Sequence, residues 1–294
     1  TRNPAPFPTY PISTAPYTTL QAVWKPKPPP ESTRKSIEDG ALKVSDIKDF
    51  EESGLGVELN QGNPWIERND LAPAYSPPAP EARKSLVYLW QSADSQLIDE
   101  ESPIRFEPFP LTYRPQGHLS TQVFEAHIRT AARISEVSGR PFDFALIAGD
   151  ITDCSQLNEF NWFFTAINGG VINPDSGIDD DPIPGPGNDY NDPFVSDGLD
   201  VPWYAALGNH DTVYHGGFGR ITDELREAAV KGEVYISNIF PNGYRDGSTI
   251  YGDVVEEGET PADENRIPLL INETLKLIYE SGGAPAGHGL SMDD

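Results

Sequence analysis

Three apolar runs separated by two amphipathic segments constrain the fold of this chain more than any other feature. The runs are residues 85–93 (SLVYLWQSA), 142–148 (FDFALIA) and 201–207 (VPWYAAL), which are short and rich in strand-forming residues. The segments between them, residues 120–139 and 155–169, have helical spacing and end in glycine. A β-α-β-α-β order predicts an α/β domain with a mostly parallel sheet flanked by helices.

The first part of the chain differs from this pattern. Residues 1–80 are rich in Pro, and because Pro lacks an amide hydrogen and fixes φ, we expect a Pro-rich N-terminal arm of extended segments and turns. Residues 42–50 predict a short helix or strand within it. The arm is either poorly ordered or packed onto the domain formed by residues 81–294. Large apolar side chains favour packing, namely Tyr10, Tyr17, Trp24 and Trp65.

An Asp-rich insert, residues 171–200, separates the second predicted helix from the third run. Long loops in compact domains are usually functional or disordered. This one fits either a solvated surface loop or a structural Ca²⁺ site, although no stretch of it has EF-hand spacing. Its acids are Asp175, Asp179, Asp180, Asp181, Asp189 and Asp192. After the third run, residues 222–230 and 268–283 predict further helices.

The charge of the chain excludes several classes of partner. Acidic residues outnumber Lys and Arg by 46 to 21, and the net charge is −25, so we expect neither nucleic acid nor an anionic membrane surface as a partner. No apolar run approaches roughly 18 residues, so no membrane span is expected. The single cysteine, Cys154, excludes an intrachain disulfide and a Cys-rich zinc site, and nothing in the sequence indicates the oligomeric state.

The chain begins at Thr1, with neither an initiating Met nor a charged-then-apolar leader. Such a start is expected for a protein exported to the periplasm or the extracellular space after signal removal. It is equally expected for a chain trimmed at its N-terminus, and the sequence does not separate the two.

Polar residues follow each of the three apolar runs directly. They are Asp94-Ser95-Gln96, then Gly149-Asp150-Ile151-Thr152-Asp153, then Gly208-Asn209-His210-Asp211. Because the carboxyl ends of parallel strands meet at one edge of a sheet, we expect these groups to surround one point. Asp150 can bridge two cations roughly 3.5 to 4 Å apart, and Asn209 can add a neutral oxygen. His210 can donate a proton to a departing alkoxide, with Asp211 available to orient its ring.

Each of these motifs also has a structural interpretation when taken alone. A lone Asp after a strand is usually a turn former or a helix N-cap, and Asp153 is expected to cap a helix that opens at Ser155. A Gly-Asn-His-Asp sequence is a common sort of turn. The order of the three motifs, each after a parallel strand, favours the functional interpretation.

At these residues the sequence resembles the calcineurin-like metallophosphoesterase superfamily. The pattern there is Asp-x-His, Gly-Asp-x-x-Asp and Gly-Asn-His-Asp/Glu, followed by a further His and Gly-His-x-His. GDITD and GNHD match it fully, and the resemblance covers roughly residues 86–215. It implies a four-layer α-β-β-α sandwich and a dinuclear metal centre, with Asp94 on the first metal, Asp150 bridging and Asn209 on the second. It also implies a metal-bound hydroxide as nucleophile and His210 as the group that assists the leaving group.

The sequence departs from this pattern twice. Gln96 stands where the first motif has His; it either ligates a metal through its amide oxygen, which would shift the preference toward Mn²⁺ or Fe²⁺, or it does not ligate. The later His motifs are missing, because only His215 and His288 follow the third motif and GHGL lacks a second His. We therefore expect the chain to be the front part of a longer protein. His215 is either a substrate-side residue or a loop histidine, whereas His118 and His127 are expected to be structural.

Two functions of different classes fit these observations. The first is a metal-dependent phosphoesterase, a hydrolase that uses two divalent ions (Mn, Fe or Zn) to cleave a phosphomonoester or phosphodiester of a small phosphorylated substrate. The alternative is a catalytically weak or inactive cation-binding interaction module that uses the acidic insert and the Pro-rich arm. Nucleotide binding on a doubly wound sheet is less favoured, because no G-x-G-x-x-G or P-loop follows any predicted strand.

Overall fold

The computed structural model describes residues 23–41, 59–64, 70–104, 117–178, 181–212, 221–232, 244–245, 254–255 and 261–290. The chain divides into two compact units, Ser13–Tyr88 and Leu89–Asp294 together with Thr1–Ile12. All three strands of the predicted parallel sheet belong to the second unit.

The Ser13–Tyr88 unit combines a small antiparallel sheet with a helix. β1 (Trp24–Pro26) pairs with β2 (Leu59–Gln61), and α1 (Glu31–Glu38) lies between them in the sequence and buries none of its side chains. A 3₁₀ helix, η1, follows at Pro80–Ala82. The region expected to hold extended segments and turns therefore also contains a helix.

Only part of the predicted arm can be compared with the structure. Trp24, one of the side chains expected to anchor it, is half-buried. The other three anchors, Tyr10, Tyr17 and Trp65, and the element predicted at residues 42–50 lie outside the described residues. How the arm relates to the domain stays a prediction.

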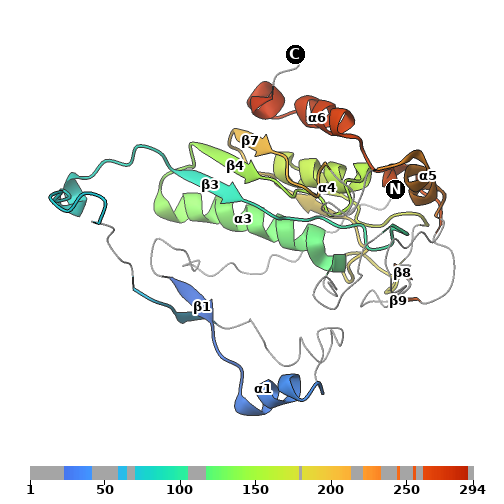
Figure 1. Ribbon diagram of the computed structural model, residues 1–294, viewed down its shortest axis with the longest axis horizontal. Helices are drawn as coiled ribbons and strands as arrows, with labels where there is room; N and C mark the ends of the chain where they lie inside the picture. Colours follow the sequence, from blue (N-terminus) through green and yellow to red (C-terminus); the bar gives the residue numbers. More distant parts are fainter. Residues whose placement is uncertain are drawn as a thin grey trace. The chain divides into compact units, whose positions relative to one another are not determined.

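The core of the second unit is a three-stranded parallel sheet. It consists of β3 (Leu89–Ser92), β4 (Phe144–Ala148) and β7 (Trp203–Ala206) in the order β3-β4-β7. Figure 1 shows the three arrows side by side and pointing the same way. The predicted α/β class and the parallel sheet are therefore confirmed, although each strand is shorter than its apolar run.

α3 (Ser120–Ser138) and α4 (Leu157–Asn168) confirm the two helices predicted between the strands, and each is followed by the expected glycine. The helices pack against each other, with the rings of Phe124 and Phe163 stacked at a centroid distance of 5.1 Å. In α3 the helical spacing of the sequence places Phe124, Ile128 and Ala131 on the buried side, whereas Val137, near the end of the same spacing, is 49% exposed.

Both helices cover the same face of the sheet. Trp90 of β3 is buried on that face against His127 of α3, and Trp203 of β7 is buried there against Phe163 of α4. The opposite face is more open. Large apolar side chains that are each at least 36% exposed lie on it, namely Leu89, Leu146 and Tyr204.

The start of α4 differs from the prediction. Its N-cap is Gln156, which forms a capping box with Glu159, so the helix opens at Leu157 rather than at Ser155. Asp153 lies upstream of this cap and is only 1% exposed. The capping role expected of Asp153 is therefore wrong, because the Gln156 and Glu159 side chains already satisfy the helix start.

The Asp-rich insert is closed by an antiparallel pair of strands that the sequence did not reveal. β5 (Gly170–Ile172) pairs with β6 (Phe194–Ser196). Between them, carboxylates of the insert accept hydrogen bonds from its own backbone amides, as Asp and Asn side chains do in turns. The amide–carboxylate pairs are Ile183–Asp189, Asn191–Asp189 and Asn188–Asp192. These acids therefore shape the loop, and the structural Ca²⁺ site stays a prediction.

Of the remaining elements, one lies between β3 and α3 in the chain and the others follow β7. They are η2 (Gly117–Leu119), α5 (Asp223–Lys231), β8 (Tyr244–Arg245), β9 (Val254–Val255), η4 (Glu264–Arg266), α6 (Ile271–Glu280) and η5 (Ala286–Gly289). α5 and α6 confirm the helices predicted after the third strand. None of the helices in the described part of the chain combines the length and hydrophobicity needed to cross a lipid bilayer.

The outer edge of β7 is bonded to the segment near the C-terminus. The amide of Trp203 donates to the carbonyl oxygen of Ala284 at 2.8 Å, and the Trp203 carbonyl oxygen lies 3.1 Å from Nδ1 of His288. The imidazole also stacks on the indole at a centroid distance of 3.3 Å. Backbone groups of β7 that do not pair with β4 therefore find partners here.

A buried cluster of charged side chains joins the loop after β3 to the insert and to η4. Arg266 is completely buried, and its guanidinium contacts Asp99 at 3.1 Å, Glu101 at 3.5 Å and Ser176 at 2.7 Å. Burial, with the nearby Asp99 carboxylate, raises the pKa of Glu101 to about 10. At neutral pH Glu101 is therefore protonated, and Asp99 balances the charge of Arg266.

Candidate metal centre

The loops that follow β3 and β4 run side by side beyond the strands. The amide of Asp94 donates to the carbonyl oxygen of Gly149 at 3.1 Å, and the amide of Gln96 donates to the carbonyl oxygen of Asp150 at 2.9 Å. A further parallel bridge between the two loops follows. The first two predicted motifs are therefore held next to each other by backbone hydrogen bonds.

The backbone is strained at three of the predicted ligands. Five non-glycine residues in the described part of the chain have a positive φ, and three of them are Asp94 (53°), Gln96 (40°) and Asp150 (47°). A residue with a side chain pays about 1 to 3 kcal/mol for such a conformation, which persists only where the surroundings fix it. Strain concentrated at neighbouring strand ends is typical of functional sites.

Gly208 allows the loop after β7 to reach Asp150. A Cβ atom at position 208 would lie 2.0 Å from Oδ1 of Asp150 and 2.2 Å from its amide nitrogen, so only glycine fits. The amide of His210 donates to the same Oδ1 at 2.9 Å. Asn209 therefore lies between two residues that contact Asp150, and the third motif meets the second at this carboxylate.

The imidazole of His210 is oriented by Asp153. Nδ1 lies 2.9 Å from the main-chain carbonyl oxygen of Asp153 and 3.5 Å from its carboxylate Oδ1. A carbonyl oxygen only accepts hydrogen bonds, so Nδ1 carries a proton and Nε2 is the nitrogen left for other chemistry. The sequence assigned this orienting role to Asp211, and the structure gives it to Asp153 instead.

Asp211 has a different role, because its carboxylate ties two loops together. Oδ1 accepts hydrogen bonds from the amide of Thr152 at 3.0 Å and from its hydroxyl at 3.2 Å, while Oδ2 accepts from the amide of Gly208 at 2.9 Å. The side chain is fully buried, and burial raises its pKa, although these three bonds oppose the shift. Asp211 thus fixes the distance between the loops after β4 and β7.

The predicted ligands can be reached from solvent. Asp94 and Asn209 are exposed, and Gln96, Asp150 and His210 are half-buried. Carboxylate and amide oxygens are donors that suit hard divalent ions such as Mg²⁺, Ca²⁺ and Mn²⁺. No group of three or more His, Cys, Asp or Glu side chains in the described ranges is arranged to hold a metal ion. The predicted set combines two carboxylates with two amides, so its fit to a metal rests on donor type and on the strained strand ends.

The other histidines lie away from this point or have structural contacts. His288 contacts Trp203 at the start of β7, at the end of the strand opposite to the site. Nδ1 of the buried His118 lies 3.8 Å from a Glu100 carboxylate oxygen, and His127 accepts a hydrogen bond from the indole of Trp90. His215, which the sequence left as either a substrate-side residue or a loop histidine, lies outside the described residues.

Sequence reasoning missed the roles of Asp153 and Glu159. The fully buried Glu159 carboxylate accepts hydrogen bonds from the amides of Cys154 and Gln156 through one oxygen, and from the amide of Asp99 through the other. Burial raises its pKa well above the usual range, and the Asp153 carboxylate adds to this effect. Glu159 therefore fixes the loop that carries Asp153. The available signal for Asp153 was its place as the second acid of GDITD.

Comparisons of this chain with protein-family models, with curated proteins and with solved structures find no match. The function of the site is therefore argued from its own residues.

Proposed function

We propose that the chain is a metal-dependent phosphoesterase, which hydrolyses a phosphomonoester or a phosphodiester at a centre of two divalent cations. The observation that carries this proposal is the meeting of strand-end motifs at Asp150, whose carbonyl oxygen bonds the loop after β3 and whose carboxylate bonds the loop after β7. The proposed metal ligands are Asp94, Gln96, Asp150 and Asn209. Mn, Fe and Zn are the proposed metals.

Two divalent cations, when bound, polarise phosphoryl oxygens, lower the pKa of bound water and offset the acidic surroundings that otherwise repel an anionic substrate. The chain supplies the rest of the arrangement. The carboxylates of Asp94 and Asp150 are brought to one edge of the sheet by the hydrogen bonds between their loops. These bonds between the loops involve only backbone atoms and do not occupy the carboxylate oxygens, although Oδ1 of Asp150 also accepts a hydrogen bond from the His210 amide.

His210 is the proposed proton donor to the leaving oxygen. The Asp153 carbonyl oxygen fixes Nδ1 as a donor, so the proton passed to substrate comes from Nε2. The Asp153 carboxylate, 3.5 Å from Nδ1, stabilises the protonated ring. Asp211 acts as a positioning residue, since it holds Thr152 and Gly208 at a fixed separation.

The proposal includes the four-layer α-β-β-α sandwich expected from the resemblance. In that arrangement the sheet of β3, β4 and β7 is one β layer, and α3 with α4 is the adjoining α layer. The exposed sheet face with Leu89, Leu146 and Tyr204 is where a second β layer would pack.

The test starts with metal analysis of protein purified without chelator. Hydrolysis of an aryl phosphate and of an aryl phosphodiester is then measured with added Mn²⁺. Asp150→Asn should abolish both metal content and turnover, because it removes the carboxylate that would hold the cations. His210→Gln should lower turnover by about 10²- to 10⁴-fold while metal content stays, because it removes a proton donor and no ligand.

Asp143→Asn is the matched control. Asp143 is a surface carboxylate that directly precedes β4 and pairs with Arg140 at 2.8 Å, so its replacement should change neither metal content nor turnover. Normal activity in Asp150→Asn would contradict the proposal. Calcium-dependent stabilisation that survives Asp150→Asn but disappears on deletion of residues 175–192 would support the cation-binding module instead.

A further inference from the structure

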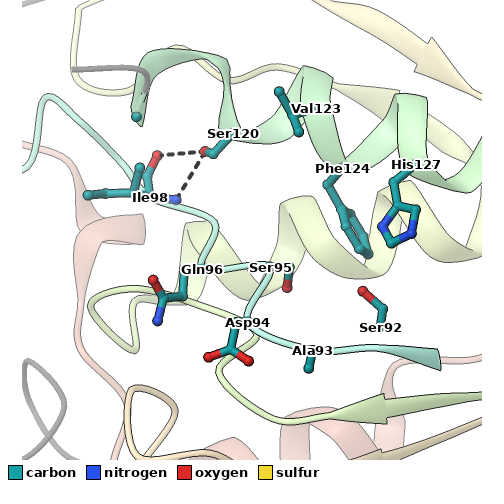
Figure 2. A pocket seen from close by; sticks show the side chains of 11 residues that line it. Ser92, Ala93, Asp94, Ser95, Gln96, Ile98, Ser120, Val123, Phe124 and His127 are labelled. Carbon is teal, nitrogen blue, oxygen red and sulfur yellow. Dashed lines mark hydrogen bonds between the residues drawn. The ribbon is translucent and has the colours of Figure 1, made fainter. Parts of the chain in front are cut away.

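A cavity of about 360 Å³ lies between the carboxyl end of β3 and α3. Figure 2 shows Phe124 and His127 pointing from α3 toward the end of β3, where Ser92 faces them. Asp94 and Gln96 also line the cavity, and both belong to the candidate metal centre. The cavity and the metal centre are therefore continuous.

The side of the cavity formed by Ile98, Val123 and Phe124 is apolar, whereas serines and the residues of the strand end add polar groups to the lining. Ile98 and Phe124 are each only 4% exposed, and Phe124 is held by its stacking on Phe163. The hydroxyl of Ser120 accepts a hydrogen bond from the amide of Ile98 at 3.2 Å, which joins the loop after β3 to the start of α3. Val123, at 62% exposure, lines the cavity from its solvent side. An apolar group entering the cavity meets a preformed surface.

The charge of the described lining favours an uncharged occupant over an anionic one. Among the described residues that line the cavity there is no Lys and no Arg, and Asp94 contributes a carboxylate. His127 accepts a hydrogen bond from Trp90 at 3.3 Å through Nε2, and burial lowers its pKa, so its ring is neutral at neutral pH. With the proposed cations held at the Asp94 end, a phosphate placed deeper in the cavity would find no cationic side chain in the described lining.

The size of the cavity suits an aromatic ring system. A closed apolar cavity of about 150 Å³ is enough to bind benzene. We propose that this cavity binds the organic group of the substrate's ester, an uncharged aryl group of about naphthyl size, while the phosphate lies at the adjoining metal centre. This inference rests on the proposed function and names its substrate class, an aryl phosphoester.

Two substitutions on α3 test the inference. Val123→Trp places a large side chain at the cavity, whereas Val137→Trp places the same side chain at a site that is also exposed, at 49%, but does not line it. Binding of 1-naphthol by calorimetry is measured first, because it needs no turnover. Both substitutions replace exposed side chains, and matching thermal unfolding curves should show that both proteins fold.

Wild type and Val137→Trp should bind 1-naphthol equally, and Val123→Trp at least about tenfold more weakly. The carboxylate analogue of 1-naphthol, 1-naphthoate, should bind the wild-type protein at least about tenfold more weakly than 1-naphthol does, because it is an anion. The ratio of kcat/KM for 1-naphthyl phosphate to that for methyl phosphate should likewise fall about tenfold in Val123→Trp and stay constant in Val137→Trp.

The outcomes separate the two proposals. If all three proteins bind 1-naphthol equally and show the same kcat/KM ratio, the cavity assignment is overturned while the phosphoesterase proposal stands. If 1-naphthol binding follows the prediction but neither phosphoester is hydrolysed, the phosphoesterase proposal is overturned, together with the role of the cavity in binding an ester. Preference for 1-naphthoate over 1-naphthol overturns the argument from charge.

Discussion

Replacing Glu101 by Gln should make the folded protein less sensitive to pH. The Glu101 side chain is 4% exposed and lies in the cluster around Arg266. Burial, followed by the carboxylates of Asp99 and Asp175, raises its pKa from 4.5 to about 10. The folded protein therefore holds a proton on Glu101 at neutral pH, whereas the unfolded chain releases it.

The sign of the effect follows from this difference in bound protons. Because the folded pKa is above the unfolded one, the stabilising contribution of protonated Glu101 is fully present below pH 4.5 and declines as pH rises toward about 10. Within that window the free energy of unfolding falls by about 1.4 kcal/mol per pH unit. From pH 5 to pH 7 the wild-type protein should lose about 3 kcal/mol through this group, and Glu101→Gln should not.

Urea unfolding followed by circular dichroism measures the effect at pH 5, 6 and 7. Other buried acids titrate in both proteins, so the quantity of interest is the difference between wild type and Glu101→Gln. That difference should shift in favour of the variant by about 3 kcal/mol across the range. Glu136→Gln is the control, because the Glu136 side chain is 65% exposed and should show no such shift. Parallel curves for wild type and Glu101→Gln would refute the buried, protonated state of Glu101.

Three further changes test the cluster and the site. Arg266→Met should lower the free energy of unfolding by about 3 to 5 kcal/mol in urea titrations, because it leaves the Asp99 carboxylate buried without its cation. Adding Asp99→Asn to this variant should recover part of the lost stability. No recovery would contradict the pairing of Asp99 with Arg266. Gly208→Ala should reduce metal content measured by elemental analysis, since its Cβ would lie 2.0 Å from Oδ1 of Asp150, and unchanged metal content would contradict the close approach. If the chain is the proposed phosphoesterase, Asp153→Asn should lower turnover of an aryl phosphate by about 10- to 100-fold and change its pH profile while metal content stays. An unchanged profile would argue against a role for its contact with the His210 ring.

The parallel sheet and its two covering helices could be predicted because their signals are local. The run ending at Ala148 is apolar from Phe144 onward, as expected for a central strand, and α3 repeats its apolar residues at helical spacing. The position of the strand ends followed from the parallel order alone. These features need no knowledge of which distant residues meet.

The missed features depend on contacts between distant parts of the chain. Asp153 and His210 are far apart in sequence, so local reasoning gave Asp153 to the nearest helix and Asp211 to the nearest histidine. No local pattern in the sequence singles out Arg266, and only its burial beside Asp99 identifies it as the centre of a cluster. The β5–β6 pair was hidden because its strands are three residues each and are separated by a long loop.

The bonds between Trp203 and the segment from Ala284 to His288 also determine where the sheet can grow. Edge strands with unpaired backbone groups recruit strands from neighbouring molecules, which is a common route to aggregation. At Trp203 both the amide and the carbonyl group are already engaged, so a foreign strand cannot extend the sheet there. The segment from Ala284 to His288 therefore protects β7 from intermolecular strand pairing at this residue.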